Sequence, residues 1–177
     1  MRITAGSMRG RIIHVPNVPG LRPTPSKVRQ ALFNILGPVC GFRVLDLFAG
    51  SGIMALEALS RGAASALSVE QHHRAVKAMQ QSRNTLDASG IWTIQARSVG
   101  QSLAGLADTS FDLIFADPPY AQGHAEILCK LLTQHDIACG QLIIEESSRV
   151  RPGWPEGWIC QQSRRYGDTC LHFLARK

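Results

Sequence analysis

Hydrophobic runs and amphipathic segments alternate along most of the chain. Short apolar runs predict buried strands at 44–48, 66–69, 92–95, 113–116 and 142–144. The spacing of apolar residues between these runs predicts helices at 52–61, 71–88, 99–106 and 122–134. Because strands that alternate with helices form a parallel sheet covered on both faces, the pattern predicts an α/β fold. The last two strands, 158–161 and 169–174, have no helix between them and predict an antiparallel hairpin that completes the sheet.

The first 42 residues follow a different pattern. Apolar and β-branched residues at 2–15 surround a glycine-bearing turn, which predicts two short paired strands. Four prolines between 16 and 25 predict an extended connector. Residues 27–36 then have the apolar spacing of an amphipathic helix. We therefore expect an N-terminal appendage at 1–42 and one α/β domain at 43–177.

The charge of the chain is concentrated at its beginning. The formal net charge is +6, and residues 1–45 contain seven basic residues and no acidic one. The rest of the chain contains twelve basic and thirteen acidic residues. Six of the seven early basic residues are arginines, whose guanidinium groups match phosphate oxygens, so a nucleic acid partner is favoured over a merely solvated basic face. The candidate RNA-binding residues are Arg9, Arg11, Arg22, Lys27 and Arg29, the last two on the outer face of the predicted helix.

Composition narrows the classes of protein that fit. The 177 residues are 45% hydrophobic and 18% charged, which fits one globular domain and excludes a disordered, highly charged chain. No apolar run is long enough to cross a bilayer, and the first residues do not form a signal peptide, so we expect a cytoplasmic protein with no membrane contact. Five scattered cysteines form no C-x-x-C pair, which predicts buried reduced thiols and no metal site.

A glycine-rich turn follows the first predicted strand. Gly50 and Gly52 let the backbone turn sharply into a helix and predict amides open to a ligand. The spacing Gly50-x-Gly52-x-x-Ala55 also fits a dinucleotide fingerprint, but Asp46 would repel a pyrophosphate and favours an amine. Glu70, after the second strand, can accept hydrogen bonds from a ribose, or serve only as an acid at a helix N-terminus. A nucleoside with a cationic group, such as S-adenosylmethionine, fits these features.

A second motif, Asp117-Pro118-Pro119-Tyr120, follows the fourth predicted strand. The two prolines hold an extended backbone, so the Asp117 side chain and the Pro118 carbonyl can face one NH₂ group together. Such an acceptor pair holds the exocyclic amine of a nucleobase for attack on a methyl group. Tyr120 can stack on the base. A stiff loop remains the alternative for this motif by itself.

The two motifs together resemble the amino-directed, S-adenosylmethionine-dependent methyltransferases. Further segments, in the same order along nearly the whole chain, make the sequence similar to the bacterial small-subunit ribosomal RNA methyltransferase D family. These segments are Ile3-Thr4-Ala5-Gly6 with Arg9-Gly10-Arg11, Leu21-Arg22-Pro23-Thr24 with Val28-Arg29 and Leu32-Phe33-Asn34, Leu56 to Ala63, and Tyr166-Gly167.

This resemblance implies a Rossmann-like class I methyltransferase fold, with a mostly parallel seven-stranded sheet whose last strands are antiparallel. It implies methylation of the N2 amine of guanine 966 in 16S rRNA, on the assembling 30S subunit, by a monomer that needs no metal. S-adenosylmethionine would leave as S-adenosylhomocysteine. The implied cofactor-binding residues are Asp46, Phe48, Ala49, Gly50, Ser51, Gly52, Glu70, Gln71, Arg97, Ser98 and Asp117, and the residues that receive the guanine are Asp117, Pro118, Pro119 and Tyr120.

After the third predicted strand, the chain departs from the family pattern. Relatives have Asn or Asp followed by Ala after the third strand, where this chain has Arg97-Ser98. We therefore assign adenine recognition to the backbone and hydroxyl of Ser98.

Three other functions are compatible with part of the sequence. A DNA adenine-N6 methyltransferase uses the same acceptor motif, although this chain has no spare length for a DNA-reading module. A non-catalytic RNA-binding or ribosome-assembly factor can keep the fold. A nicotinamide-dependent dehydrogenase is disfavoured by Asp46 and leaves the motif at 117–120 unexplained.

Overall fold

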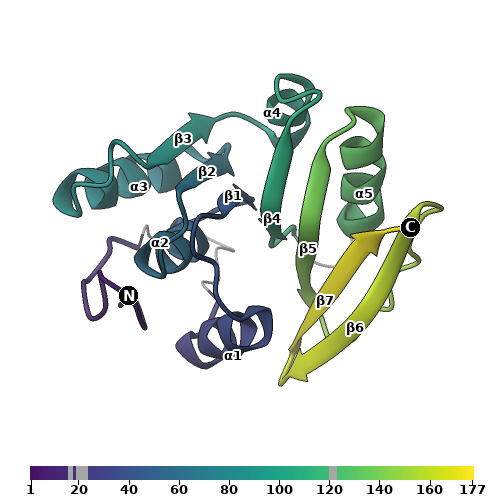
Figure 1. Ribbon diagram of the computed structural model, residues 1–177, viewed down its shortest axis with the longest axis horizontal. Coiled ribbons are helices and arrows are strands. Elements are labelled where there is room, and N and C mark those ends of the chain that lie inside the picture. The colour runs from purple at the N-terminus through teal and green to yellow at the C-terminus, as the bar shows by residue number, and fades with distance from the viewer. Residues whose placement is uncertain (16–17, 19–23, 120–122) are drawn as a thin grey trace.

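A computed structural model describes residues 1–177 apart from 16–17, 19–23 and 120–122 (Figure 1). The strands in the described residues are β1 (Arg43–Leu47), β2 (Ser65–Glu70), β3 (Trp92–Ala96), β4 (Ser110–Ala116), β5 (Ala138–Ser147), β6 (Trp158–Tyr166) and β7 (Thr169–Arg176). The helices are α1 (Ser26–Leu36), α2 (Ile53–Ser60), α3 (His73–Thr85), α4 (Val99–Ala104) and α5 (His124–Gln134). Each predicted strand and helix of the α/β domain is present, and most differ from the prediction only at their ends.

The strands form one sheet in the order β3-β2-β1-β4-β5-β7-β6. Neighbouring strands from β3 to β5 are parallel, whereas β7 is antiparallel to both β5 and β6. This arrangement confirms the predicted fold class. The strand order reverses between β1 and β4, and a ligand crevice is expected at the carboxyl ends of the strands flanking such a reversal. Asp46 and Asp117 therefore meet at the position where a binding site is expected.

Alternating side chains of the strands feed two hydrophobic cores. Val44, Leu113 and Ile143 face a core shared with α1, α2 and α3. The next residue on each of these strands faces the other core, which is shared with α4 and α5. Figure 1 shows these two groups of helices on either side of the sheet.

The N-terminal segment packs closely on the end of α2. The two predicted strands are reduced to one bridge between Arg2 and Ile12. The backbone of Gly6, with φ +83°, approaches α2 so closely that a Cβ atom there would lie 1.7 Å from the carbonyl oxygen of Ser60. Ser7 N–H also donates to that oxygen at 2.7 Å. Only glycine fits this conformation and this close contact.

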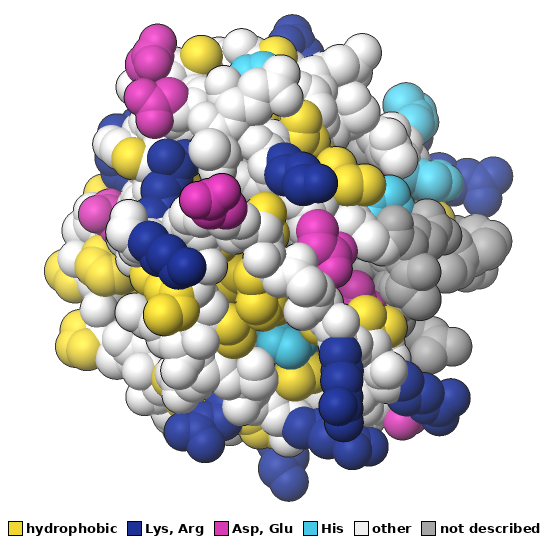
Figure 2. Space-filling view, turned by 90° about the vertical axis from the view of Figure 1, so that its right-hand side faces the viewer, with side chains coloured by type: hydrophobic (Ala, Val, Ile, Leu, Met, Phe, Trp, Pro, Cys, Tyr) yellow, Lys and Arg dark blue, Asp and Glu magenta, His cyan; other side chains and the backbone are white. Residues whose placement is uncertain are grey.

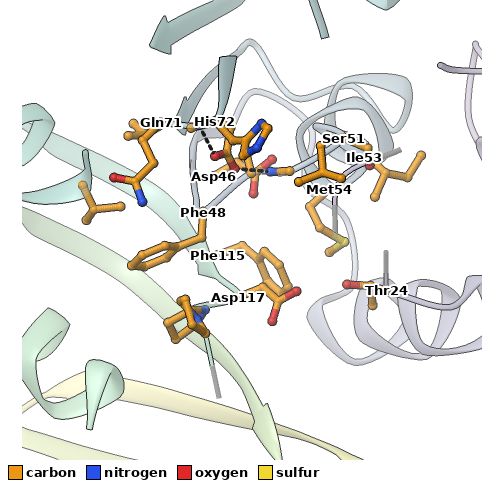
Figure 3. A pocket seen from close by; sticks show the side chains of 18 of the residues that line it. Thr24, Asp46, Phe48, Ser51, Ile53, Met54, Gln71, His72, Phe115 and Asp117 are labelled. Carbon is orange, nitrogen blue, oxygen red and sulfur yellow. Dashed lines mark hydrogen bonds between the residues drawn. The ribbon is translucent and has the colours of Figure 1, made fainter. Parts of the chain in front are cut away.

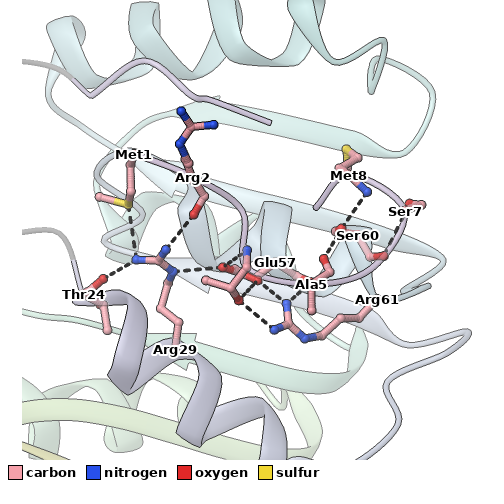
Figure 4. A network of polar contacts seen from close by, with 11 residues as sticks. Met1, Arg2, Ala5, Ser7, Met8, Thr24, Arg29, Glu57, Ser60 and Arg61 are labelled. Atoms are coloured by element: carbon pink, nitrogen blue, oxygen red, sulfur yellow. Dashed lines mark hydrogen bonds and ion pairs between the residues drawn. The ribbon is translucent and has the colours of Figure 1, made fainter. Parts of the chain in front are cut away.

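Arg29 is buried, which contradicts its predicted place among the RNA-binding residues. It is 1% exposed, and its Nε lies 3.0 Å from Oε1 of Glu57 in α2. Its terminal nitrogens donate to the carbonyls of Thr24 and Arg2 (Figure 4). A phosphate group cannot reach a guanidinium whose donors are used inside the protein. Lys27 is exposed as predicted.

The other predicted RNA-binding residues differ in what the structure says of them. Arg9 and Arg11 are exposed, and Arg11 donates to the carbonyl of Thr85 at the end of α3. Arg22 lies outside the described residues.

Basic side chains are not confined to the N-terminal segment. Figure 2 shows Lys and Arg side chains gathered along the lower edge of the face that it presents. Arg164 and Arg165 are exposed on the edge strand β6. The charge count along the sequence missed such local groups because it averaged them with acidic residues elsewhere.

The cysteines are free thiols, but not all of them are buried. Cys40 is exposed in the loop between α1 and β1, contrary to the prediction. Burial raises the pKa of Cys129 to about 12 and that of Cys139 to about 11, so these thiols stay protonated at neutral pH. Within the described residues, no helix is long and apolar enough to span a membrane, and no three His, Cys, Asp or Glu side chains are grouped to hold a metal ion.

Candidate active site

A cavity of about 770 Å³ opens at the carboxyl ends of β1, β2 and β4 (Figure 3). Its size is within the range of ligand pockets. Most of the predicted site residues line it, namely Asp46, Phe48, Ala49, Gly50, Ser51, Glu70, Gln71, Arg97, Asp117, Pro118 and Pro119. Gly52 and Ser98 are not among its lining residues, and Tyr120 lies outside the described part of the chain.

The turn between β1 and α2 uses left-handed backbone conformations at Phe48 (φ 57°), Gly50 (φ 54°) and Gly52 (φ 72°). A bulky residue such as Phe48 rarely adopts a positive φ, and strain of this kind is common at functional sites. A Cβ atom on Gly52 would lie 2.4 Å from the ring of Trp92. Gly52 is therefore required by packing as well as by its backbone angle.

The amides of Gly50 and Gly52 are not left open, contrary to the prediction. Gly50 N–H donates to Oε2 of Glu70 at 2.9 Å, and Gly52 N–H donates to the carbonyl of Ala49 at 2.7 Å. The other carboxylate oxygen of Glu70 accepts from His72 N–H at 2.7 Å. Glu70 thus ties the end of β2 to the glycine turn while it also lines the cavity. The sequence placed Glu70 near the turn but gave no signal of this direct contact.

Asp46 is a buried carboxyl at the end of β1. Its Oδ2 accepts from Ala55 N–H at 3.3 Å and from the Ser68 hydroxyl at 3.4 Å. Burial raises its pKa to about 8, an effect that these two hydrogen bonds oppose and the nearby charge of Glu70 reinforces. Among the described residues, no basic side chain forms an ion pair with it. A cation that entered the cavity would therefore be attracted to Asp46 and would lower its pKa.

Asp117 lies directly after β4 in a similar environment. Burial raises its pKa well above the usual range, and the charges of Glu145, Asp46 and Glu146 raise it further. The register pairs Ala116 with Ile144, so Asp117 and Glu145 follow side by side on neighbouring strands. Pro118 and Pro119 continue the wall of the cavity. The arrangement places hydrogen-bond acceptors around a space large enough for a ligand.

Of the pair Arg97 and Ser98, only Arg97 lines the cavity. The next lining residue along the chain is Val99. Ser98 caps α4 instead: its hydroxyl accepts from Gln101 N–H, and the Gln101 side chain accepts from Ser98 N–H. Because both groups are engaged in this capping box, the assignment of adenine recognition to the backbone and hydroxyl of Ser98 is not supported.

Eight lining residues were not identified as site residues in the sequence, namely Val18, Thr24, Ile53, Met54, Val69, His72, Val99 and Phe115. Thr24 comes from the end of the proline-rich connector, Met54 from the first turn of α2 and Val99 from the start of α4. Met54 occupies a variable position of the glycine-rich motif, and Thr24 ends the segment Leu21-Arg22-Pro23-Thr24 on which the family resemblance rests. The general preference for ligand sites at strand ends could have suggested Val99, whereas the segment that contains Thr24 gave no indication that this residue lines a cavity.

Comparison with known proteins places the chain in a family. Residues 1–175 match the family model described as Conserved hypothetical protein 95. The chain is 36% identical over 181 residues to Ribosomal RNA small subunit methyltransferase D of Escherichia coli (strain K12), covering 100% of this chain and 90% of that protein. It belongs to the ribosomal RNA small subunit methyltransferase D family. The resemblance stated from the sequence motifs is thereby confirmed.

Another relative and a solved structure are consistent with this family. The Putative rRNA methyltransferase YlbH of Bacillus subtilis (strain 168) is 34% identical over 175 residues, covering 96% of this chain and 95% of that protein. The solved structure of the putative methyltransferase yhhF from Escherichia coli matches with a TM-score of 0.87 and 32% identity, and covers 100% of this chain and 98% of that one. The family therefore shares its methyltransferase fold with this chain over the full described length.

Proposed function

We propose that this family member transfers a methyl group from S-adenosylmethionine to the N2 amine of a guanine in 16S rRNA, guanine 966, on the assembling 30S subunit. The observation that carries the proposal is the pair of buried carboxyls, Asp46 and Asp117, on adjacent strand ends of one cavity. One carboxyl suits a cationic cofactor and the other suits an amine to be methylated. The names of the relatives in E. coli and B. subtilis support an rRNA substrate.

The residues of the cavity fit this cofactor. Asp46, a buried acid without a described ion-pair partner, would hold a cationic amine. Glu70 keeps acceptor capacity for ribose hydroxyls after its two amide contacts, since a carboxylate has about four acceptor sites. Arg97 and Val99 line the cavity and would take the role at the adenine that was assigned to Ser98. When bound, the cofactor supplies an electrophilic methyl group, and S-adenosylhomocysteine is the product.

Asp117 and the backbone at Pro118 would hold the target amine. The Asp117 side chain and the Pro118 carbonyl each accept one N–H of the guanine amine, which aims the nitrogen at the methyl carbon. Once it carries the methyl group, the amine nitrogen would lose a proton. Asp117 can hold that proton because its pKa is raised. We also propose that Tyr120 stacks on the extruded base.

The N-terminal residues 1–42 would grip the RNA backbone as an appendage to the domain at 43–177. Arg9, Arg11 and Lys27 are exposed and can reach phosphates. We keep Arg22 in this role, whereas Arg29 is removed from it because it is buried. The protein would act as a monomer in the cytoplasm, where its substrate is assembled.

The test is transfer of labelled methyl from S-adenosylmethionine to three substrates: naked 16S rRNA, 30S particles from cells that lack this protein, and adenine-containing duplex DNA. The labelled nucleoside is then identified by mass. Labelled N2-methylguanosine at one position in the particles is the expected result. Labelled adenine in DNA would overturn the proposal in favour of a DNA methyltransferase. Cofactor binding without transfer to any substrate would overturn it in favour of a non-catalytic assembly factor.

A further inference from the structure

Thr24 lines the cavity although neither the glycine-rich turn nor the motif at 117–120 contains it. It stands immediately before Pro25, the N-cap of α1, and is 4% exposed. Both Thr24 and Asp117 line the cavity, and Figure 3 shows their polar ends turned toward each other across it. A target base held by Asp117 would therefore have Thr24 near one of its edges.

Two hydrogen bonds hold Thr24 in place. Its hydroxyl donates to Oε2 of Glu145 at 2.8 Å, and its carbonyl accepts from Nη1 of Arg29 at 2.6 Å (Figure 4 shows the second of these). Both partners are buried, Glu145 at 2% exposure and Arg29 at 1%. Such buried, charge-assisted hydrogen bonds leave the side chain little freedom to turn. Arg29 thus supports the cavity wall rather than the RNA backbone.

The contact with Glu145 also fixes the polarity of Thr24. A hydroxyl has one proton to donate and two lone pairs that accept, whereas an ionised carboxylate only accepts. The Thr24 proton is engaged by Glu145, so the hydroxyl can offer the cavity only its lone pairs. Thr24 is therefore an acceptor with respect to a bound ligand.

We propose that Thr24, oriented by Glu145, accepts the N1–H of the target guanine and so makes the site select guanine over adenine. This inference rests on the proposed function. In guanine the amine is flanked by N1–H, which is a donor, whereas in adenine it is flanked by N1, which is an acceptor. An adenine placed with its amine on Asp117 would bring the N1 lone pair against the lone pairs of Thr24, and a buried acceptor without a donor is unfavourable.

Glu145 and Asp117 lie on one face of the sheet, at the ends of neighbouring strands. Ile143 packs in the core beside α1 and α2, and Ile144 packs in the core on the other face of the sheet. Because side chains alternate along a strand, Glu146 lies on the face opposite to Ile143, and Glu145 lies on the same face as Ile143. Asp117, next to Glu145 on the neighbouring strand, shares that face, since Leu113 and Phe115 pack in the same core as Ile143. One strand end thus orients Thr24 while its neighbour presents the acceptor for the amine.

The test compares two target bases in otherwise identical 30S particles. One particle carries guanine at the target position, and the other carries 2-aminopurine, which has the same amine but an unprotonated N1. Methyl transfer to each is measured as kcat/KM with the full-length enzyme. We expect the wild type to prefer guanine by about 10- to 100-fold, the range expected for one buried donor–acceptor pair.

Three variants separate the role of Thr24 from a structural one. Thr24→Val removes the hydroxyl with little change of shape, so transfer to guanine should fall while transfer to 2-aminopurine stays, and the preference should fall to about one. Thr24→Ser keeps the hydroxyl and should keep the wild-type preference. Glu145→Gln can donate its amide N–H to Thr24, which frees the Thr24 proton to face N1 of 2-aminopurine, so the preference should also fall.

Glu146→Gln is the matched control, because it makes the same change one residue along on the opposite face; it should retain the preference. The inference is overturned if Thr24→Val keeps the wild-type preference, including the case in which both substrates decline in parallel because the cavity is distorted. If the wild type methylates neither base, the proposed function itself has failed, which is a separate outcome from an unchanged preference.

Discussion

Two sets of buried acids on one face of the sheet differ in their partners. Glu57 in α2 is fully buried and is matched by Arg29 and Arg61 and by two hydrogen bonds from Thr4 (Figure 4). Asp46 is as deeply buried, yet among the described residues it has only an amide and a hydroxyl as partners. Glu57 is the centre of a buried ion-pair network, whereas the carboxyl of Asp46 has a raised pKa and lines a cavity.

The comparison shows how a buried acid can be recognised as structural or functional. Removing a carboxylate from water costs free energy. At Glu57 the charge of the buried Arg29 guanidinium offsets this cost. At Asp46 and Asp117 the offset is incomplete, so both acids tend to hold protons until a ligand supplies positive charge or N–H donors. Incomplete compensation inside a cavity is typical of candidate functional sites.

The largest effect on stability is expected when the ion-pair network of Glu57 loses its acid. Glu57→Gln keeps the shape but leaves Arg29 buried without its counter-charge, and loss of one partner of a buried pair destabilises a protein by about 3–5 kcal/mol. The free energy of unfolding in urea measures this. Asp168→Ala, which removes an exposed ion pair with Arg149, should change little. Equal stability of Glu57→Gln and the wild type would show that the ion pairs of Glu57 do not stabilise the fold.

Removing the acceptor for the amine should affect catalysis instead of stability. Asp117→Ala should lower kcat by about 10²–10³-fold, a typical result when one group that acts on the reacting centre is lost. The affinity for S-adenosylmethionine, measured by calorimetry, should change much less than kcat. Near-normal turnover of this variant would remove Asp117 from the proposed site.

The raised pKa of Asp46 makes stability depend on pH. The folded protein holds a proton with a pKa of about 8, whereas the unfolded chain has the ordinary value of 3.8. The contribution of this group is therefore complete below about pH 4 and is lost as the pH rises through 8. Asp46→Asn removes the titration but can still accept from Ala55 N–H. We expect the wild type to lose stability more steeply than this variant between pH 5 and 8.

Added S-adenosylmethionine should sharpen that test. A cation beside Asp46 lowers its pKa, so the wild-type pH dependence should become flatter when the cofactor is bound. A wild-type slope equal to that of Asp46→Asn without cofactor would show that Asp46 is ionised in the free protein.

The smallest effect concerns the exposed basic residues. Arg9→Ala with Arg11→Ala should weaken RNA binding and reduce the slope of log affinity against log salt by about 1.5, since each lost phosphate contact contributes about 0.7–0.9. Lys130→Ala, an exposed basic residue on α5, is the matched control and should keep the slope. An unchanged slope in the double variant would argue against an RNA grip by the N-terminal segment.

Lys27 and Arg29 were predicted to be exposed on the same helix, but only Lys27 is exposed. Helical spacing put both residues outside the apolar stripe of α1, and Lys27 is exposed as expected. Arg29 is buried because the N-terminal segment and α2 cover that side of the helix and supply Glu57 as its partner. The periodicity of one helix indicates its apolar face but not what packs against its polar face.

The sequence by itself determined the order of strands and helices and the places of Asp46, Glu70 and Asp117 at strand ends. These follow from local hydrophobic patterning and from the rule that parallel strands end at one edge of the sheet. Only the tertiary structure decided that Gly50 N–H is held by Glu70 and that Thr24 faces Asp117 with Glu145 behind it. These contacts join residues from separate segments, and hydrogen bonds between distant parts of a chain leave no periodic signal in the sequence.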